Sequence, residues 1–392
     1  MSEVDSIIAS LDDIDVSLFD NNADRIRARD ALNNALRRLQ SPWDIAWDHV
    51  IGNSSGNAAI KTLIDVGVFK SWAEAGGEPI TCTELARLTG KDETLIRRMM
   101  RCIAGQYLVI ETDFDTYART PWAKSLGDDQ GLRAWYGGFY SQLIGPLLRT
   151  LPVYLKEAGY KNPTDHTNCN FQHWQGPDSM FFNYVGSNPL LTADFNDAME
   201  GNSRGNLTDW PKIYPTETLV EGALPGRAVV VDVGGGKGHD LKKFHLRNPT
   251  VPASDLILQD LPAILKNVER DPGFTIQEYD FFTPQPVKGA RAYFAHGVLH
   301  DWPELKAVEI LKIVAEAMDK GYSKLLIHEN MINERNPVAR VTSLDVLMMG
   351  GLAAAERTES QWRSIITSAG LKIVKIWRGR DMAECIIEAE LV

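Results

Sequence analysis

From about residue 216 onwards, short apolar stretches alternate with stretches of helical periodicity. The apolar stretches are AVVVDV, LILQD, AYFAHGV, KLLIHEN, LKIVKIW and CIIEAEL, and the helical ones include LKKFHLR and ELKAVEILKIVAEAMDK. This alternation predicts a doubly wound α/β sheet whose strands are mostly parallel. Only about six residues around Arg378 separate the last two strands, which is too few for a crossover helix. We therefore predict that these two strands form an antiparallel hairpin at the end of the sheet.

A different pattern, within residues 1–125, predicts a helical unit with two short strands. Thr81 is a candidate N-cap, with Glu84 three residues on and the helical segment LARLTG behind it. A second helix is indicated by DETLIRRMMRCIAGQ, and LVIET and TYART are typical of strands. Two helices followed by a hairpin predict a winged helix-turn-helix.

A winged helix raises the question of DNA binding, which the charge of this segment disfavours. Between Thr81 and Lys124, seven Lys or Arg residues stand against six Asp or Glu residues, and the whole chain has a formal net charge of -11. Nucleic-acid binding depends on clustered basic side chains. We predict no nucleic-acid partner and interpret the segment as a packing or dimerisation module.

The N-terminus carries acids where a secretion signal needs a basic segment and an unbroken apolar one. It shows instead four apolar residues at helical spacing, which predict an amphipathic helix docked on its own or a neighbouring subunit: Ile7, Ile8, Leu11 and Ile14. No segment approaches the roughly 20 apolar residues of a membrane span. The four cysteines lie far apart, without the spacing of a disulfide framework. These features predict a cytoplasmic protein with no membrane partner.

Together the patterns predict three regions. Residues 1–125 form the helical dimerisation domain, residues 126–215 a helical linker that lines a substrate pocket, and residues 216–392 a cofactor-binding catalytic domain. The linker is dense in aromatic residues, of which Trp135 and Phe139 are candidate contacts for a flat apolar substrate. Packing in the core is the alternative for each aromatic residue.

The first apolar stretch runs into a glycine-rich turn that reads D-x-G-x-G-x-G from Asp232. Its candidate cofactor contacts are Gly234, Gly235 and Gly236, since glycines let the backbone approach a ligand closely. A dinucleotide fingerprint needs its third glycine one residue later, where this chain has His239. Asp232 is placed where a carboxylate helps to hold a cationic amino-acid ligand.

Acids also follow the next two predicted strands. Asp260, followed by Leu261, ends LILQD, where a carboxylate accepts hydrogen bonds from both hydroxyls of a ribose. Asp280 and Phe281 follow the third strand and suit the amino group and the face of an adenine. Capping of the helix at Leu261 is the alternative for Asp260, and a loop acid is the alternative for Asp280. The three acids in sequence order favour a nucleoside cofactor.

The motifs VDVGGG, QDLP, DFF, VLHDWP, LLIHE and ERTESQW together resemble those of plant and fungal O-methyltransferases of the caffeate O-methyltransferase type. The similarity extends over nearly the whole chain and is especially close to the fungal branch of secondary metabolism. It implies a class I methyltransferase fold, in which a mostly parallel Rossmann-like sheet ends in an antiparallel hairpin behind an N-terminal winged-helix dimerisation domain. It also implies S-adenosyl-L-methionine as cofactor and a homodimer.

The candidate base is His300, placed by the pattern at the end of the fourth strand, where ligands of α/β sheets bind. A phenol with a pKa of about 10 needs about three units of help at neutral pH, which an imidazole can give. Glu329, at the end of the fifth strand, and Glu356, ahead of a helix, could each orient the imidazole. The alternatives are a surface acid for Glu329 and a helix N-terminal acid for Glu356. The resemblance assigns His300 as base, both glutamates as its support and Asp301 as a neighbour of the acceptor.

Three further residues are candidate acceptor contacts. Met348 and Met349 are predicted on a helix that faces the acceptor, with core packing as the alternative. His296 departs from the usual family pattern ahead of VLHDWP, which bears on the identity of the acceptor. A metal is not required, and we interpret His166, Cys169 and His173 as a solvated loop rather than a ligand set.

These observations lead to two functional hypotheses. The first is an S-adenosylmethionine-dependent O-methyltransferase that acts on a phenolic or enolic secondary metabolite of aromatic or polyketide type. The second is a pericyclase or dehydratase that keeps the cofactor but catalyses a Diels–Alder or Alder-ene type reaction on a polyketide-peptide 2-pyridone, without methyl transfer.

Overall fold

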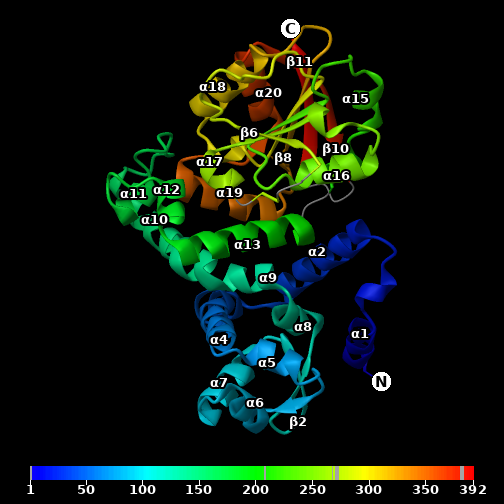
Figure 1. The fold of residues 1–392 in the computed structure, drawn as a ribbon. Helices are drawn as coiled ribbons and strands as arrows, with labels where there is room; N and C mark the ends of the chain where they lie inside the picture. Colours follow the sequence, from blue (N-terminus) through cyan, green and yellow to red (C-terminus); the bar gives the residue numbers. More distant parts are fainter. Residues whose placement is uncertain (1, 207–208, 267, 270–272, 380–383) are drawn as a thin grey trace. The chain divides into compact units, whose positions relative to one another are not determined.

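The computed structural model describes residues 2–206, 209–266, 268–269, 273–379 and 384–392, drawn in Figure 1. The chain divides into two compact units, residues Met1–Tyr136 and Gly137–Val392. None of the helices in the described part of the chain is long and apolar enough to cross a membrane.

The first unit is mainly helical and has a small sheet in the order β1-β3-β2. Its elements are α1 (Glu3–Asp12), η1 (Val16–Leu18), α2 (Asn22–Leu39), α3 (Pro42–Trp47), η2 (Asp48–Gly52), α4 (Asn53–Asp65), α5 (Val68–Glu74), β1 (Ile80–Thr81), α6 (Cys82–Thr89), α7 (Glu93–Ala104), β2 (Val109–Asp113), β3 (Thr116–Arg119), α8 (Pro121–Asp128) and α9 (Gln130–Ala134). A further helix, η3 (Trp135–Ile144), begins in this unit and ends in the second.

The two helices and two strands expected after residue 80 are present as α6, α7, β2 and β3. The side chain of Thr81 accepts the N–H of Glu84 at 3.2 Å, so Thr81 is the N-cap of α6. The core of this unit includes Phe69, Trp72 and Met100, each at most 1% exposed.

The predicted N-terminal helix is α1, but it is shorter than expected. It ends at Asp12, so Ile14 lies beyond it, and α1 contains no buried residue. Ile7, Ile8 and Leu11 are between 47% and 55% exposed. The apolar side chains of α1 are therefore left exposed by the described residues of the chain.

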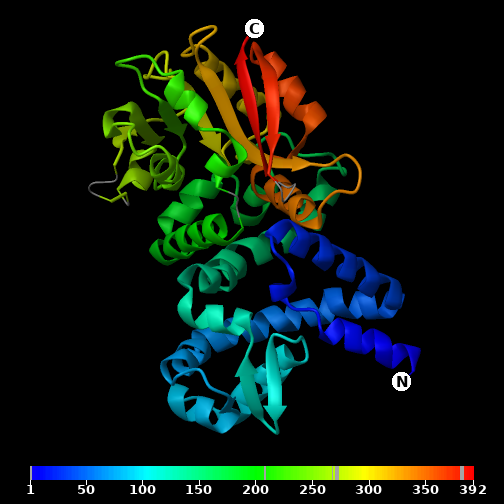
Figure 2. The same ribbon diagram turned by 90° about the vertical axis from the view of Figure 1, so that its right-hand side faces the viewer.

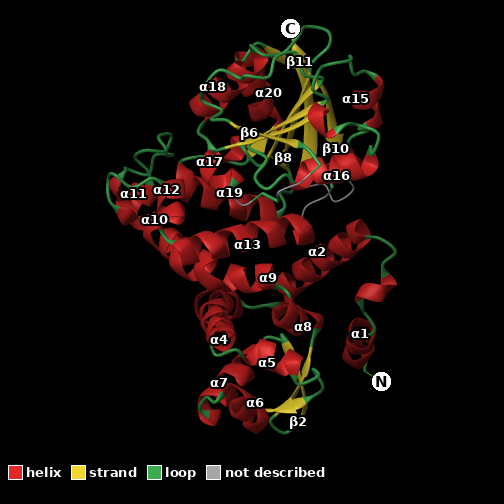
Figure 3. Cartoon of the chain, viewed as in Figure 1, coloured by secondary structure: helices red, strands yellow, loops and turns green. Residues whose placement is uncertain are grey.

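The second unit is built around an eight-stranded sheet, shown in Figure 3 with helices around it. Its strands are β4 (Val230–Val233), β5 (Leu256–Asp260), β6 (Thr275–Glu278), β7 (Ala292–His296), β8 (Lys324–Ile332), β9 (Arg357–Thr358), β10 (Leu371–Arg378) and β11 (Glu384–Leu391). Its helices are α10 (Gly145–Glu157), α11 (Asn170–Gln175), α12 (Phe181–Ser187), α13 (Pro189–Asn206), α14 (Trp210–Ile213), α15 (Glu217–Glu221), α16 (His239–Arg247), η4 (Ala253–Asp255), α17 (Pro262–Leu265), η5 (Leu299–Asp301), α18 (Glu304–Ala315), α19 (Ala339–Leu352) and α20 (Glu359–Ser368).

The strand order β10-β11-β8-β7-β4-β5-β6 confirms a mostly parallel sheet, with β9 paired to the end of β8. Strand β11 is antiparallel to both β8 and β10. The expected C-terminal hairpin is therefore confirmed, as Figure 2 shows. Residues 380–383 of its turn lie outside the described residues.

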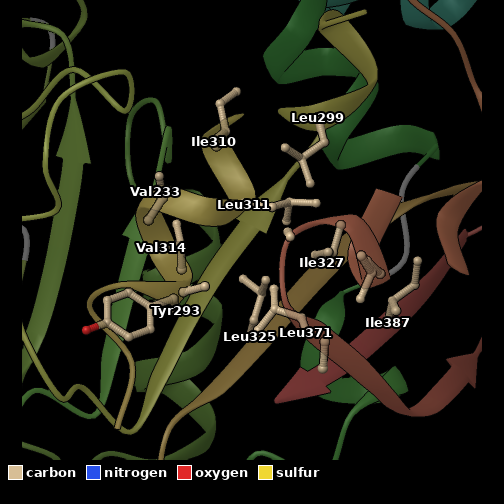
Figure 4. Close-up of a cluster of buried hydrophobic side chains, with 14 of the residues drawn as sticks. Val233, Tyr293, Leu299, Ile310, Leu311, Val314, Leu325, Ile327, Leu371 and Ile387 are labelled. Carbon is tan, nitrogen blue, oxygen red and sulfur yellow. The ribbon is translucent and has the colours of Figure 1, made fainter. Parts of the chain in front are cut away.

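Alternate residues of the central strands face two separate cores. Val231 and Val233 of β4 pack with α18 and α20, whereas Val230 packs with α14 and α16 on the other face. Figure 4 shows the first core, which includes Leu299, the residue next to His300. Packing of Leu299 thus anchors the turn that carries the candidate base.

The aromatic residues after residue 170 largely pack on one another. Phe171 is fully buried and makes edge-on contacts with Trp174, Phe181 and Tyr184 at 5.4–5.9 Å between ring centroids. Core packing is therefore the role that the structure gives to this group.

Candidate active site

The glycine-rich turn follows β4 and leads into α16. Gly236 has φ of 59°, and a Cβ placed there would meet no atom within 4 Å. A Cβ at Gly235 would lie 2.4 Å from Asp232 and 2.6 Å from Leu258. Only glycine fits at position 235, and the backbone at position 236 is open to a ligand.

Asp232 is a buried carboxylate for which the described residues supply no hydrogen-bond donor. It is 1% exposed, and neither carboxylate oxygen accepts a hydrogen bond from any residue in the described part of the chain. Burial, with the nearby charge of Asp240, raises the pKa of Asp232 well above its usual range. A cationic or N–H-bearing ligand at the glycine-rich turn would satisfy this group, so the site fits the amino-acid part of S-adenosylmethionine.

The acid at the end of β5 reaches the same turn. Asp260 accepts the N–H of Gly236 at 2.8 Å and the N–H of Leu261 at 2.7 Å. The N-cap of α17 is Leu261, without a side-chain bond, so Asp260 is not the helix cap. Burial raises the pKa of Asp260. Its carboxylate therefore links the turn to the end of β5. At this position it could accept hydrogen bonds from the hydroxyls of a ribose.

After β6, Asp280 accepts the N–H of Phe282 at 3.0 Å. Phe281 makes edge-on contacts with Phe282 and with Trp302, at 5.1 and 5.9 Å between ring centroids. Trp302 closely follows His300 in sequence. These contacts bring the segment after β6 against the segment that carries the candidate base.

The structure corrects the position of His300. Strand β7 ends at His296, and His300 lies in the 3-10 turn η5, four residues further on. Its Nδ1 lies 2.7 Å from Oε1 of Glu356 and 3.8 Å from Oε2 of Glu329. Its Nε2 lies 3.5 Å from Oδ1 of Asp301. All four predicted catalytic residues are thus brought together.

The two glutamates hold different parts of this group. Oε1 of Glu329 accepts the N–H groups of Val298, Leu299 and His300 at 2.9–3.2 Å, which fixes the turn. Oε1 of Glu356 contacts the imidazole. Glu329 is 3% exposed and lies inside β8, so both the surface-acid interpretation and its expected place at the strand end are wrong.

Glu356 is not a helix N-terminal acid either. Helix α20 begins at Glu359 and is capped by Thr358. Glu356 is 2% exposed, and its N–H donates to Asp345 at 3.0 Å. Its carboxylate is therefore directed to His300 rather than to a helix terminus.

The electrostatics of this group favour a charged imidazole. Burial alone would lower the pKa of His300, but the charges of Glu329 and Asp301 and the hydrogen bond with Glu356 outweigh burial and raise it well above its usual range. Burial raises the pKa of Asp301 to about 6, although the charge of His300 opposes this.

His296 is held in a half-buried polar pair. Its Nδ1 lies 2.7 Å from Oδ2 of Asp240, in the first turn of α16, and its ring stacks on that of His328 at 3.9 Å between centroids. The Asp240 contact joins the end of β7 to the helix behind the glycine-rich turn. Sequence reasoning missed Asp240 and His328, because only the strand order brings them to His296.

The remaining candidates lie in several elements. Met348 and Met349 are half-buried in the C-terminal part of α19. Phe139 is 5% exposed and packs on Phe195 at 5.9 Å between centroids. Trp135 is the first residue of η3 and belongs to the first unit.

His166, Cys169 and His173 have separate partners. His166 lies against the ring of Trp302, Cys169 is buried beside Gln172, and His173 is 3.3 Å from Glu157. Cys169 is thus not in a solvated loop. In the described part of the chain, two groups of side chains are close enough to share a cation: His300 with Glu329 and Glu356, and His296 with His328 and Glu384.

Comparison with known proteins agrees with this geometry. Residues 154–372 match a family model described as an O-methyltransferase domain. The chain is 37% identical to O-methyltransferase mfmE of Annulohypoxylon moriforme, over 100% of this chain and 96% of that protein. It is 26% identical to a solved structure titled as a pericyclic reaction enzyme, with a TM-score of 0.89 and 99% of each chain covered. It is 25% identical to OxaC, solved with S-adenosylhomocysteine and oxaline, with a TM-score of 0.84 over 99% of this chain and 98% of that one.

Proposed function

Since this chain belongs to the O-methyltransferase family of fungal secondary metabolism, we propose that its acceptor is a phenolic or enolic hydroxyl and that His300 is the general base. The protein is an S-adenosylmethionine-dependent O-methyltransferase that acts on a secondary metabolite. The observation that carries the proposal is the 2.7 Å contact between Nδ1 of His300 and Glu356. With Nδ1 held in this way, Nε2 is the nitrogen that can take a proton.

We assign the cofactor contacts to the elements around the glycine-rich turn. Asp232 and the backbone of Gly234, Gly235 and Gly236 would hold the amino-acid part, and Asp260 with Leu261 the ribose. Asp280 and Phe281 would hold the adenine. When bound, S-adenosyl-L-methionine supplies a methyl group on a sulfonium. The unsatisfied carboxylate of Asp232 supports this assignment.

The protein residues handle the proton of the acceptor. In the proposed reaction the acceptor O–H bond breaks and its proton passes to Nε2 of His300, while Glu356 and Glu329 balance the resulting charge. Oδ1 of Asp301 lies 3.5 Å from Nε2, so Asp301 would be a neighbour of the acceptor hydroxyl. The proposed acceptor contacts are His296, Met348, Met349 and Phe139.

The direct test is turnover with a panel of polyketide phenols and enols. Release of S-adenosylhomocysteine, with an acceptor heavier by one methyl group, is the expected result. A substrate that is converted to an isomer, or loses water, without S-adenosylhomocysteine release would contradict methyl transfer.

That second outcome is the alternative function, a cofactor-bound pericyclase or dehydratase. One observation favours it: the acids around His300 favour an imidazolium, which donates a hydrogen bond to a substrate carbonyl. The similarity to a pericyclic reaction enzyme points in the same direction. Methyl transfer also needs the arrangement of His300 with its neighbouring acids. Because the chain belongs to the O-methyltransferase family, we favour methyl transfer over the alternative.

The raised pKa of His300 predicts an alkaline pH dependence of methyl transfer. A base must be neutral, and His300 is protonated at pH values below its raised pKa. We therefore expect kcat/KM to rise with pH through the neutral range and to fall as pH decreases, with a midpoint above the ordinary imidazole value of about 6.5. A pH–rate profile measured with saturating cofactor tests this, and a midpoint below about 6 would contradict it.

We further propose that residues 1–125 form the dimerisation domain of a homodimer. In support, the helices before α4 expose large apolar side chains, including Leu39 at 85%, Trp43 at 84% and Trp47 at 66%. Apolar surface of this kind marks an interface. A second copy of the chain is the occupant that we propose.

Sedimentation of the purified protein tests this proposal. The unaltered protein is expected to sediment as a dimer, and the double variant Trp43→Glu, Trp47→Glu as a monomer, because charges at an apolar interface are left without partners. The matched control is Tyr107→Glu, at another exposed aromatic residue of the same unit, which should stay dimeric. A monomeric unaltered protein would refute the proposal.

We also propose the division into regions 1–125, 126–215 and 216–392, and a cytoplasmic location. The unpaired state of all four cysteines supports the location.

A further inference from the structure

Arg357, the residue after Glu356, is a buried guanidinium that holds the backbone on either side of the candidate base. It is 1% exposed, and β9 places it beside Met331 at the end of β8. Its Nη1 donates to the carbonyl of Leu299 at 2.8 Å, and its Nη2 donates to the carbonyl of Trp302 at 2.6 Å. The planar fork of a guanidinium can bind two carbonyls at once, whereas a lysine ammonium offers a single centre.

The turn that receives these bonds has little internal support. Helix η5 is three residues long, and its N–H bonds from Asp301 and Trp302 are both 3.3 Å long. Glu329 binds three N–H groups of this turn, and Arg357 binds two of its carbonyls. The N–H groups of the turn thus donate to the carboxylate of Glu329, and its carbonyls accept from the guanidinium of Arg357. The direction of the His300 side chain therefore depends on both residues.

The charge of Arg357 also interacts with the acids around His300. Burial lowers its pKa, but the carboxylates of Glu329, Glu304, Glu356 and Asp345 oppose this. The ring of Trp362 lies 5.3 Å from its guanidinium carbon, a cation–π contact. Two of these acids, Glu329 and Glu356, are the ones that contact His300. Arg357 is therefore a buried cation whose charge interacts with both glutamates, and His296 is a second cation that lowers the pKa of Glu329.

We propose that Arg357 is a positioning residue for catalysis, which fixes the turn carrying His300 through the carbonyls of Leu299 and Trp302 and balances the charge of Glu329 and Glu356. This inference rests on the proposed role of His300 as base. Among the described residues, the hydrogen bonds of Arg357 go to the backbone rather than to the imidazole, so it would act through the backbone and the charges of the two glutamates.

Two variants separate the two parts of the role. Arg357→Lys keeps the charge but not the fork, so kcat should fall on the order of tenfold or more while the midpoint of the pH–rate profile stays in place. Arg357→Met removes both, so kcat should fall further and the midpoint should rise by about one pH unit, because the group around His300 then binds a proton more readily. The acids that act on His300 directly are Glu329, Glu356 and Asp301. Two cations act through these acids: His296 interacts with Glu329, and Arg357 interacts with Glu329 and Glu356.

The control is Arg363→Met, since Arg363 is 55% exposed on α20 and pairs with Glu359. Its kcat and pH profile should match those of the unaltered protein. Affinity for S-adenosylhomocysteine, measured by calorimetry, should change less than about threefold in Arg357→Lys, since Arg357 is not among the proposed cofactor contacts. If Arg357→Met does not fold, the lysine variant decides the question through kcat.

An NMR titration of the His300 imidazole makes the test independent of turnover. A higher imidazole pKa in Arg357→Met than in Arg357→Lys supports the inference even if no acceptor is methylated. Unchanged kcat in Arg357→Lys, or equal imidazole pKa values in both variants, would overturn it. Failure of methyl transfer in the unaltered protein would instead overturn the proposed function.

Discussion

Replacement of His300 by alanine is expected to lower kcat for methyl transfer by about 10²- to 10⁴-fold, the range that a positioned general base contributes. The imidazole is the group that is held by Glu356 at 2.7 Å and that has a second nitrogen beside Asp301. Without the imidazole, no base at this position can take the proton from the hydroxyl of the substrate. Steady-state kinetics with saturating cofactor and a methylated acceptor provide the measurement.

Binding should be left largely intact by this change, because His300 is not among the proposed cofactor contacts. Calorimetric affinity of His300→Ala for S-adenosylhomocysteine should remain within about threefold of the original. The control is His173→Ala, whose imidazole pairs with Glu157 away from the group, and which should keep full kcat. A His300→Ala enzyme that keeps more than half of the original kcat would remove His300 from the mechanism.

Replacement of Asp232 by asparagine is expected to have opposite effects on binding and on stability. Asp232 is buried without a hydrogen-bond partner among the described residues, so its carboxylate is poorly stabilised in the ligand-free protein. Asparagine removes the charge and keeps the shape. We expect the Tm of the ligand-free protein to rise, and affinity for S-adenosylmethionine to fall on the order of 100-fold because the cationic ligand loses its partner.

The same residue predicts how stability depends on pH. The folded pKa of Asp232 is raised above its unfolded value, so its contribution to stability is present below the unfolded pKa and is lost as pH rises through the folded pKa. The gain in Tm of Asp232→Asn should therefore be larger at pH 8 than at acidic pH. The control is Asp178→Asn, at an exposed position of the same unit. Unchanged cofactor affinity in Asp232→Asn would show that this carboxylate is not part of the site.

Much of the catalytic unit follows from local pattern. The gap of a few residues after LKIVKIW was enough to predict that β10 and β11 form a hairpin, because no crossover fits in it. The order of Asp232, Asp260 and Asp280 along the chain predicted a row of acids after successive strands, and the structure brings Asp260 to the turn after β4.

The roles of the acids around His300 depend on contacts distant in sequence. Glu329 is 29 residues from His300 and Glu356 is 56 residues away. Which of them binds the imidazole and which binds the backbone is set by the pairing of β8 with β7 and β9. Sequence pattern also placed His300 at a strand end, because a 3-10 turn of three residues has no periodicity of its own.

Arg357 and the His296–Asp240 pair were not anticipated. Charged side chains are rarely buried, so a single arginine in ERTESQW is expected on the surface. Its burial is explained only when the carbonyls of Leu299 and Trp302 are seen to face it. One feature of the sequence could have indicated Arg357. It directly follows Glu356, which the family resemblance assigned as a supporting acid of His300.

We propose that methyl transfer to an acceptor hydroxyl proceeds with His300 as the base. Mass spectrometry of the product formed from methyl-deuterated S-adenosylmethionine tests it most directly, with the unaltered protein beside His300→Ala. We expect a product that carries one deuterated methyl group on oxygen, formed rapidly by the unaltered protein and at no more than about 1% of that rate by the variant. An unlabelled product with the mass of the substrate, or of the substrate less water, would contradict it.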